Sequence, residues 1–267
     1  MPYIAVNGVK LYHELRGGGD ETVVFVNGVL ANTMSWTHQA ALLAKRYQVL
    51  LYDCRGQGQS EKPPQDYPME LHAADLDALL EALRIKRAHI VGISYGGEIG
   101  MLLAIRHPER VKGLIVADSV SQVDPPLERR IEAWISAART RDPKRFFTIT
   151  TPDIFSEGFI ERNPQLLELV EQGYVELDYG AVARLLRCFK EFNITGELHK
   201  IGASTLIICG EKDRLKPPRY SELIHQEIPD SEFVLIKDAG HAVTYERPEE
   251  FTTVVLGFLE KLKLREG

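Results

Sequence analysis

The sequence predicts an α/β fold with a mostly parallel sheet of eight strands, flanking helices and a helical cap inserted after the sixth strand. Strand-type apolar runs alternate with helical patterns up to residue 117 and again from residue 205, which is typical of βαβ units. Between these stretches, residues 122–200 contain helical patterns and no convincing strand. The chain therefore divides into a first core part (1–121), a helical cap (122–200) and a second core part (201–267).

The first core part begins with a predicted antiparallel hairpin. Residues 3–6 and 9–16 alternate in polarity around Asn7-Gly8, a dipeptide that favours two-residue hairpin turns. The continuous apolar run 22–26 is typical of a strand that is covered on both faces. The elements that follow are a helix near 34–46, a strand at 47–52, an amphipathic helix at 70–84, strands at 88–91 and 111–117, and a helix between these two strands.

The cap and the second core part follow in the same order along the chain. Helical stretches are expected at 127–138, 143–147, 164–173 and 179–192, in a segment rich in aromatic residues. The strand pattern resumes at 205–209 and 233–236, with a helix at 217–228 between them and a final helix that starts near Pro248. The aromatic residues of the cap indicate either an apolar substrate pocket or the packing of the cap on the core.

Composition argues against several classes of partner. The net charge of −6 disfavours nucleic acid and anionic membranes. No apolar run approaches the ~20 residues that span a bilayer, and the amino terminus does not resemble a signal peptide. Three scattered cysteines suit a reducing compartment. We therefore expect a cytoplasmic monomer or homodimer that acts on a small molecule, without a nucleic-acid or membrane partner.

One short motif stands between a strand and a helix. In Gly92-Ile93-Ser94-Tyr95-Gly96, the serine must occupy a tight, strained turn, and the glycines on either side remove side chains that would collide there. Such a turn exposes the hydroxyl of Ser94 at the carboxyl edge of the sheet. The motif by itself occurs often by chance, so its meaning depends on finding a base and an acid downstream.

A serine nucleophile needs an imidazole to take its proton and a carboxylate to orient that imidazole. His241 follows the last strand and precedes the last helix, and Asp213 follows the strand before it. The order Ser94, Asp213, His241 along the chain is typical of nucleophile-elbow enzymes. Asp118, after the strand that follows the serine, is the alternative acid, and we favour Asp213 because its loop is a typical acid turn.

Nothing in the sequence points to a metal or a cofactor. The eight histidines include no pair with the H-E-x-x-H pattern or another ligand spacing. Acyl transfer through a serine requires no cofactor. We therefore expect neither.

The sequence resembles the capped α/β-hydrolases, the group that includes esterases, enol-lactonases and C–C bond hydrolases. The matching stretches are Asn27-Gly28-Val29, residues 53–60, residues 92–97, residues 210–213 and Gly240-His241, which together span nearly the whole chain outside the cap. The resemblance implies Ser94 as the nucleophile, His241 as the base and Asp213 as the orienting acid. It also implies an oxyanion hole formed by the backbone N–H groups of Val29 and Tyr95.

One position departs from the family pattern. The family usually has a histidine before the glycine of the oxyanion loop, where this chain has Asn27. An asparagine can hold a loop by hydrogen bonds from its side chain to the backbone, and it can also reach a substrate or a water molecule. We expect the structural role and keep Asn27 among the candidate substrate-binding residues.

The resemblance implies hydrolysis of carboxylic esters with small to medium acyl groups. Hydrolysis of enol-lactones, cleavage of a carbon–carbon bond and perhydrolysis use the same three residues and stay open. A different class, a ligand-binding receptor that keeps the fold without turnover, also stays open because the fold alone does not determine function. The candidate substrate-binding side chains are Asn27, Leu30, Trp134, Phe146 and Phe189.

Overall fold

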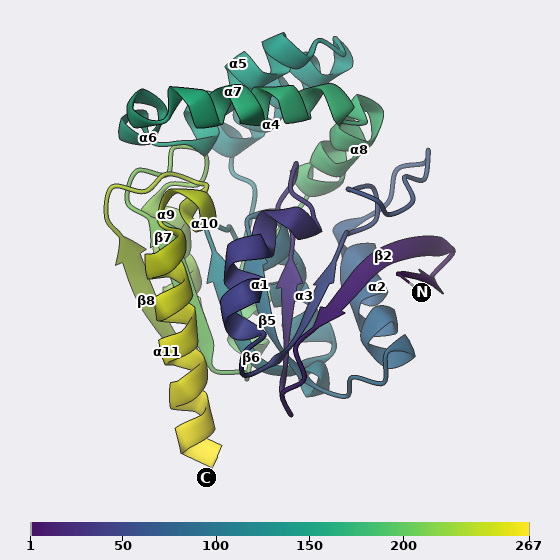
Figure 1. Cartoon of the computed structure of the whole chain (residues 1–267), viewed down its shortest axis with the longest axis vertical. Helices are drawn as coiled ribbons and strands as arrows, with labels where there is room; N and C mark the ends of the chain where they lie inside the picture. Colours follow the sequence, from purple (N-terminus) through teal and green to yellow (C-terminus); the bar gives the residue numbers. More distant parts are fainter. Residues whose placement is uncertain (1, 267) are drawn as a thin grey trace.

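Eight strands form one sheet in the order β1-β2-β4-β3-β5-β6-β7-β8 in the computed structural model, which describes residues 2–266 (Figure 1). The strands are β1 (Tyr3–Val6), β2 (Val9–Arg16), β3 (Thr22–Val26), β4 (Gln48–Tyr52), β5 (Ala88–Ile93), β6 (Val111–Ala117), β7 (Thr205–Gly210) and β8 (Ser231–Ile236). The pairs β1–β2 and β2–β4 are antiparallel, and the five other pairs are parallel. The expected eight-stranded, mostly parallel sheet is confirmed.

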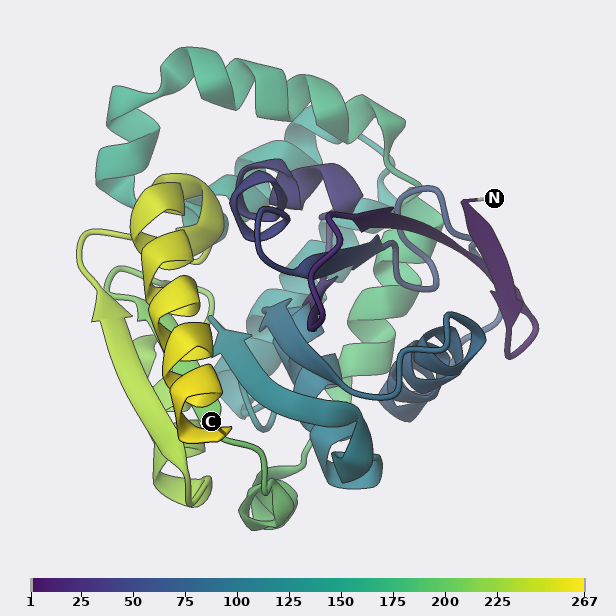
Figure 2. The same ribbon diagram turned by 60° about the horizontal axis from the view of Figure 1, so that its bottom comes forward.

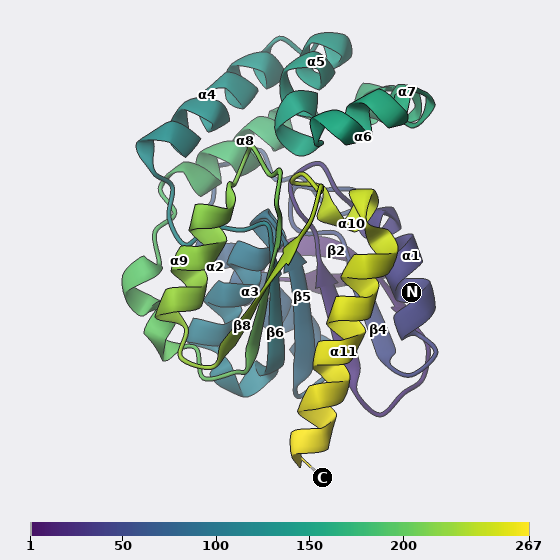
Figure 3. The same ribbon diagram turned by 90° about the vertical axis from the view of Figure 1, so that its left-hand side faces the viewer.

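Helices cover both faces of the sheet. The α-helices of the described chain are α1 (Thr37–Leu43), α2 (Met69–Ala82), α3 (Tyr95–Arg106), α4 (Pro125–Arg139), α5 (Pro143–Ile154), α6 (Glu157–Arg162), α7 (Pro164–Gly173), α8 (Tyr179–Lys190), α9 (Pro218–Glu227), α10 (Val243–Glu246) and α11 (Pro248–Glu266). Helices α1 and α11 pack on one face, and α2, α3 and α9 pack on the other (Figure 3). Successive strand residues therefore enter different cores, as Val24 and Phe25 do.

The amino-terminal hairpin forms where the sequence predicts it. Asn7 and Gly8 both have positive φ angles, of 45° and 74°, as a two-residue hairpin turn requires. Figure 2 shows this hairpin at one edge of the sheet, with β8 at the opposite edge. The catalytic candidates Ser94, Asp213 and His241 follow the carboxyl ends of the parallel strands β5, β7 and β8.

The segment between β6 and β7 forms helices α4 to α8, which lie over one end of the sheet (Figures 1 and 3). It leaves and returns at one point, because Gln122 and Asn193 form an isolated antiparallel bridge. The backbone N–H groups of Val123 and Ile194 extend this contact by hydrogen bonds to Phe192 and Ser121. The cap is therefore tied to the core at its base.

The differences from the expected elements are short ones. Helix α5 continues through Pro152 to Ile154, beyond the expected end at residue 147. Helices α6 and α10 were not expected; they contain six and four residues, too few for a helical period to be read from the sequence. Among residues 2–266, no helix combines the length and the apolar composition needed to cross a membrane.

Candidate active site

Ser94 lies on the tight turn between β5 and α3. Its φ of 53° and ψ of −121° are strained for a residue with a side chain. A Cβ atom on Gly92 would lie 2.2 Å from the carbonyl oxygen of Gly96, and one on Gly96 would lie 2.0 Å from that of Val26. Only glycine therefore fits at these two positions, and the turn depends on both.

We expect Gly96→Ala to lower the free energy of unfolding by about 1–3 kcal/mol or more, because the added methyl group meets rigid backbone. Gly257→Ala in α11 is the matched control, because nothing lies within 4 Å of the added methyl group. Alanine loses less conformational entropy on folding than glycine does, so this variant should be as stable as the wild type or more stable. Urea unfolding of both variants measures the difference. Equal stabilities would show that the turn adapts to a side chain.

Asp213 and His241 come together at the ends of β7 and β8. His241 Nδ1 lies 2.8 Å from Asp213 Oδ2, and both side chains are buried. The second carboxylate oxygen, Oδ1, accepts a hydrogen bond from the backbone N–H of Lys216 at 2.8 Å. The carboxylate can only accept, so the imidazole holds its proton on Nδ1 and Nε2 is left as the basic nitrogen.

Asp118, the alternative acid, is engaged elsewhere. It is fully buried at a φ of 45°, and its Oδ1 accepts a hydrogen bond from the backbone N–H of Gly210 at 2.8 Å. Burial and the neighbouring charge of Asp213 raise the pKa of Asp118 well above its usual range. Of the two candidate acids, the structure thus brings Asp213 into contact with His241 and leaves Asp118 as a carboxyl group that favours its neutral form.

Within residues 2–266, one group of side chains offers three nearby metal-ligand atoms, namely Asp118, Cys209 and Asp213, all within 4.8 Å of one another. Asp213 is already bound to His241, and Cys209 Sγ lies 3.4 Å from the carbonyl oxygen of Gly210. Burial raises the pKa of the Cys209 thiol as well as that of Asp118, and a metal binds only the deprotonated forms. The group is therefore a poor fit for a cation.

Ser94 and His241 both line an apolar cavity of about 170 Å³. Its other lining residues come from the loop after β3, from the 3-10 turn just before α1, from the end of β5, from the cap, from the loop after β7 and from the segment around α10: Gly28, Val29, Leu30, Ala31, Ser35, Trp36, Ile93, Trp134, Ile154, Phe155, Val170, Tyr174, Leu215, Ala242, Thr244 and Tyr245. Ser94 and His241 form no hydrogen bond with each other in the described part of the chain. Contacts of this kind often tighten only when substrate binds.

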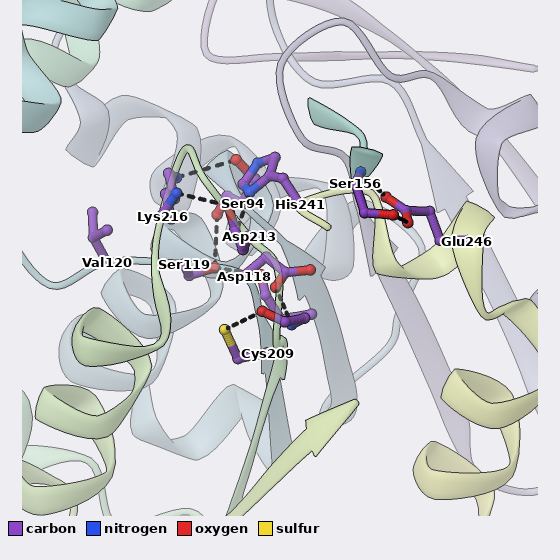
Figure 4. Close-up of polar contacts among 12 residues, drawn as sticks. Ser94, Asp118, Ser119, Val120, Ser156, Cys209, Asp213, Lys216, His241 and Glu246 are labelled. Carbon is purple, nitrogen blue, oxygen red and sulfur yellow. Dashed lines mark hydrogen bonds and ion pairs between the residues drawn. The ribbon is translucent and has the colours of Figure 1, made fainter. Parts of the chain in front are cut away.

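The cap is held against the loop that carries His241. The backbone N–H and the hydroxyl of Ser156, at the start of α6, both donate to the carboxylate of Glu246 in α10, at 2.9 and 2.5 Å (Figure 4). The backbone N–H of Ala242, next to His241, donates to the carbonyl oxygen of Ile154 at 2.9 Å. These contacts fix the cap side of the cavity relative to the candidate base.

Asn27 is a brace and does not face the cavity. It is fully buried, its Nδ2 donates to the carbonyl oxygen of Tyr52 at 2.9 Å and to Asp53 Oδ1 at 3.3 Å, and its Oδ1 accepts from Trp36 Nε1 at 2.8 Å. All of its hydrogen-bonding partners belong to the core. The place of Asn27 among the substrate-binding candidates is therefore corrected, and its side chain instead holds the loop after β3.

The remaining substrate-binding candidates separate into two pairs. Leu30 and Trp134 line the cavity. Phe146 is fully buried inside the cap, where it packs against Trp134, Tyr174 and Tyr179, and Phe189 packs against Tyr95 and Phe192. These two aromatic residues fill the cap and its seam with the core and are not among the residues that line the cavity.

The oxyanion-hole candidates lie beside Ser94. Val29 lines the cavity, and Gly28 before it is so close to the turn that an added Cβ atom would lie 3.4 Å from Ser94 Cβ. Tyr95 is the first residue of α3, where backbone N–H groups have no helical partner. Its side chain points away, with the hydroxyl 2.9 Å from His72 Nε2, so only its backbone can serve the site.

Sequence reasoning missed Lys216 and Glu98. Lys216 Nζ lies 3.1 Å from Ser94 Oγ (Figure 4) and 2.8 Å from Glu98 Oε1. Lys216 and Glu98 are almost completely buried. The available signals were a lysine three residues after Asp213 and a glutamate at the start of an otherwise apolar helix. Neither signal predicts that the two side chains meet at the serine.

Known proteins of similar sequence and fold match nearly the whole chain. The alpha/beta hydrolase fold family matches residues 21–248. A relative from Caulobacter vibrioides, named "Putative carbamate hydrolase RutD", is 30% identical over 94% of this chain and 95% of its own. The solved enol-lactonase of Burkholderia xenovorans LB400 has a TM-score of 0.91 and 29% identity, covering 97% of this chain and 100% of its own. A thermophilic esterase of Thermogutta terrifontis has a TM-score of 0.87 and 27% identity, covering 98% and 97%. The chain therefore belongs to the α/β-hydrolase family, and it is a hydrolase.

Proposed function

We propose that the protein hydrolyses carboxylic esters of small to medium acyl groups through Ser94, His241 and Asp213. The observation that carries the proposal is the buried contact of 2.8 Å between His241 Nδ1 and Asp213 Oδ2, on a cavity wall shared with Ser94. This arrangement supplies a nucleophile, a base and an acid that sets the tautomer of the base.

In the first half of the reaction, Ser94 Oγ attacks the acyl carbon while its proton passes to His241 Nε2. The backbone N–H groups of Val29 and Tyr95 stabilise the negative oxygen of the tetrahedral intermediate. When the intermediate collapses, the proton on Nε2 moves to the departing alcohol and Ser94 carries the acyl group. In the second half, His241 takes a proton from water, the water attacks the acyl carbon, and Ser94 is released with its proton restored.

The cavity supports a neutral substrate of limited size. Its volume is about 170 Å³, and no arginine of the cap is among its lining residues. Arg130 and Arg187 of the cap instead pair with Asp153 and Asp66. An uncharged acyl group therefore fits this wall better than a carboxylate does.

The names of the relatives make enol-lactones the second candidate. The enol-lactonase of Burkholderia xenovorans covers nearly the whole chain, and a lactone is an internal ester that the same three residues would open. Carbamates are a third candidate because of the relative from Caulobacter vibrioides. A lactone and a carbamate both present an electrophilic carbonyl carbon to Ser94, so the same three residues could act on all three classes.

A substrate panel tests the proposal. We expect turnover of p-nitrophenyl acetate and butyrate, with kcat/KM falling about tenfold or more for the dodecanoate, since a chain too long for the cavity must displace packed side chains. Enol-lactones and aryl carbamates are measured in parallel. A higher kcat/KM for either of these classes would reassign the substrate. If a folded sample turns over none of them, the protein is a ligand-binding relative without catalysis.

A further inference from the structure

The nucleophile has a cationic neighbour that the three-residue mechanism does not use. Lys216 Nζ donates hydrogen bonds to Ser94 Oγ at 3.1 Å and to Glu98 Oε1 at 2.8 Å, and it lies 4.7 Å from the centre of the Phe189 ring. Figure 4 shows the lysine beside Ser94, at the same end of the sheet as Asp213 and His241. The ammonium group thus has two hydrogen-bond acceptors and an aromatic ring as neighbours.

Lys216 lies in the same turn as the acid Asp213. Asp213 Oδ1 accepts the backbone N–H of Lys216 at 2.8 Å, so the acid that orients His241 also fixes the chain at the lysine. Glu98 lies four residues after Ser94, in the first turn of α3, on the same side of the helix. The backbone N–H of Val120 donates to the same oxygen, Glu98 Oε1, at 3.0 Å and helps to hold the glutamate in place.

Burying this ion pair costs folding free energy, and side-chain packing alone gives no reason for its presence. Lys216 is 2% exposed and Glu98 is fully buried, so both charges lose their hydration. Glu98 Oε2 has no hydrogen-bond partner within the described residues, which adds to that cost. A buried ion pair is often no more stabilising than a well-packed apolar pair of similar volume. A role in the reaction therefore accounts for a charge at the reacting oxygen better than a role in stability does.

The hydrogen bond from Lys216 also restricts the direction in which the hydroxyl proton of Ser94 points. An ammonium group can only donate, so Ser94 Oγ is the acceptor in this contact. The hydroxyl proton must then point elsewhere, and it is free to be transferred to His241 Nε2. An ammonium group has no lone pair, so as an ammonium Lys216 is a donor and not a base.

We propose that Lys216 is a further catalytic residue, whose ammonium group stabilises negative charge on Ser94 Oγ, and that Glu98 is the positioning residue that holds it there. The inference rests on the serine-hydrolase function proposed above. In acylation, the bond from Oγ to the acyl carbon forms as the hydroxyl proton leaves for Nε2. In deacylation, this bond breaks, its electron pair returns to Oγ, and Oγ takes the proton back from His241. Lys216 keeps its three protons in both halves.

The test compares Lys216→Met with the double variant Glu98→Gln/Lys216→Met. The single variant leaves Glu98 buried without its counter-charge and is expected to melt at a lower temperature. The double variant removes both charges and should melt close to the wild type. Both should lose about 10- to 100-fold in kcat for p-nitrophenyl acetate and in the rate of fluorophosphonate labelling, with KM little changed, as expected when a charge-assisted hydrogen bond to the reacting atom is lost.

Lys212→Met is the matched control. Lys212 lies in the same turn, its side chain is 55% exposed and it pairs with Glu211, so its loss should leave both rates unchanged. If the double variant keeps the stability and the rates of the wild type, the buried pair is structural and the inference is wrong. If His241→Ala retains labelling that Lys216→Met abolishes, the lysine is the base, which also overturns it. If the wild type is neither labelled nor active, the proposed function fails and this inference falls with it.

Discussion

Ser94→Ala should lower kcat for ester hydrolysis by about 10⁵-fold or more, because the acyl-enzyme can no longer form. Removing this one hydroxyl eliminates the bond-forming atom, while the cavity and the backbone N–H groups beside it remain. Hydrolysis of p-nitrophenyl acetate measures the loss, and mass spectrometry after fluorophosphonate treatment should show a single adduct in the wild type and none in the variant. Thermal melting should place the two proteins close together.

Ser221→Ala is the matched control for that experiment. Ser221 is a fully buried serine of α9 that does not line the cavity, and it is hydrogen-bonded to none of the proposed catalytic side chains in the described part of the chain. It should retain full activity and full labelling. If Ser94→Ala retained turnover, the reaction would not pass through this serine.

Asp213→Asn should lower kcat by about 10⁴-fold with little change in KM. The amide of asparagine can donate to Nδ1 of His241, which favours the tautomer with the proton on Nε2 and removes the base that Ser94 needs. The volume of the side chain is nearly unchanged, so stability should change far less than activity. Steady-state kinetics with p-nitrophenyl acetate and urea unfolding separate the two effects.

Asp118→Asn is the discriminating partner of that variant. Burial and the charge of Asp213 raise the pKa of Asp118, so its carboxyl group favours the neutral form that asparagine mimics. The amide oxygen of asparagine can still accept the hydrogen bond from Gly210. Asp118→Asn should therefore keep kcat within a few-fold of the wild type. A large loss in Asp118→Asn and a small one in Asp213→Asn would reverse the assignment of the acid.

The order of elements was predictable because its signals are local. Asn7-Gly8 predicted the hairpin, the apolar run 22–26 predicted a strand with two covered faces, and the structure confirms both. The turn at Ser94 was predictable for the same reason, since glycines at fixed spacing around a serine can be read without knowing what packs nearby. Helices α6 and α10 were not, because elements this short carry no periodicity.

The sequence by itself determined the fold class, the position of the strained serine and a short set of candidates for its base and acid, because strand periodicity, glycine spacing and chain order are properties of neighbouring residues. The tertiary structure alone decided what each buried side chain faces. In the structure Asp213, and not Asp118, contacts His241. Asn27 braces the core, and Phe146 and Phe189 pack in the cap and at its seam with the core. Lys216 contacts Glu98 although 118 positions separate them in the chain. Hydrophobicity predicts that a residue leaves water, but only the three-dimensional packing determines which partner it meets.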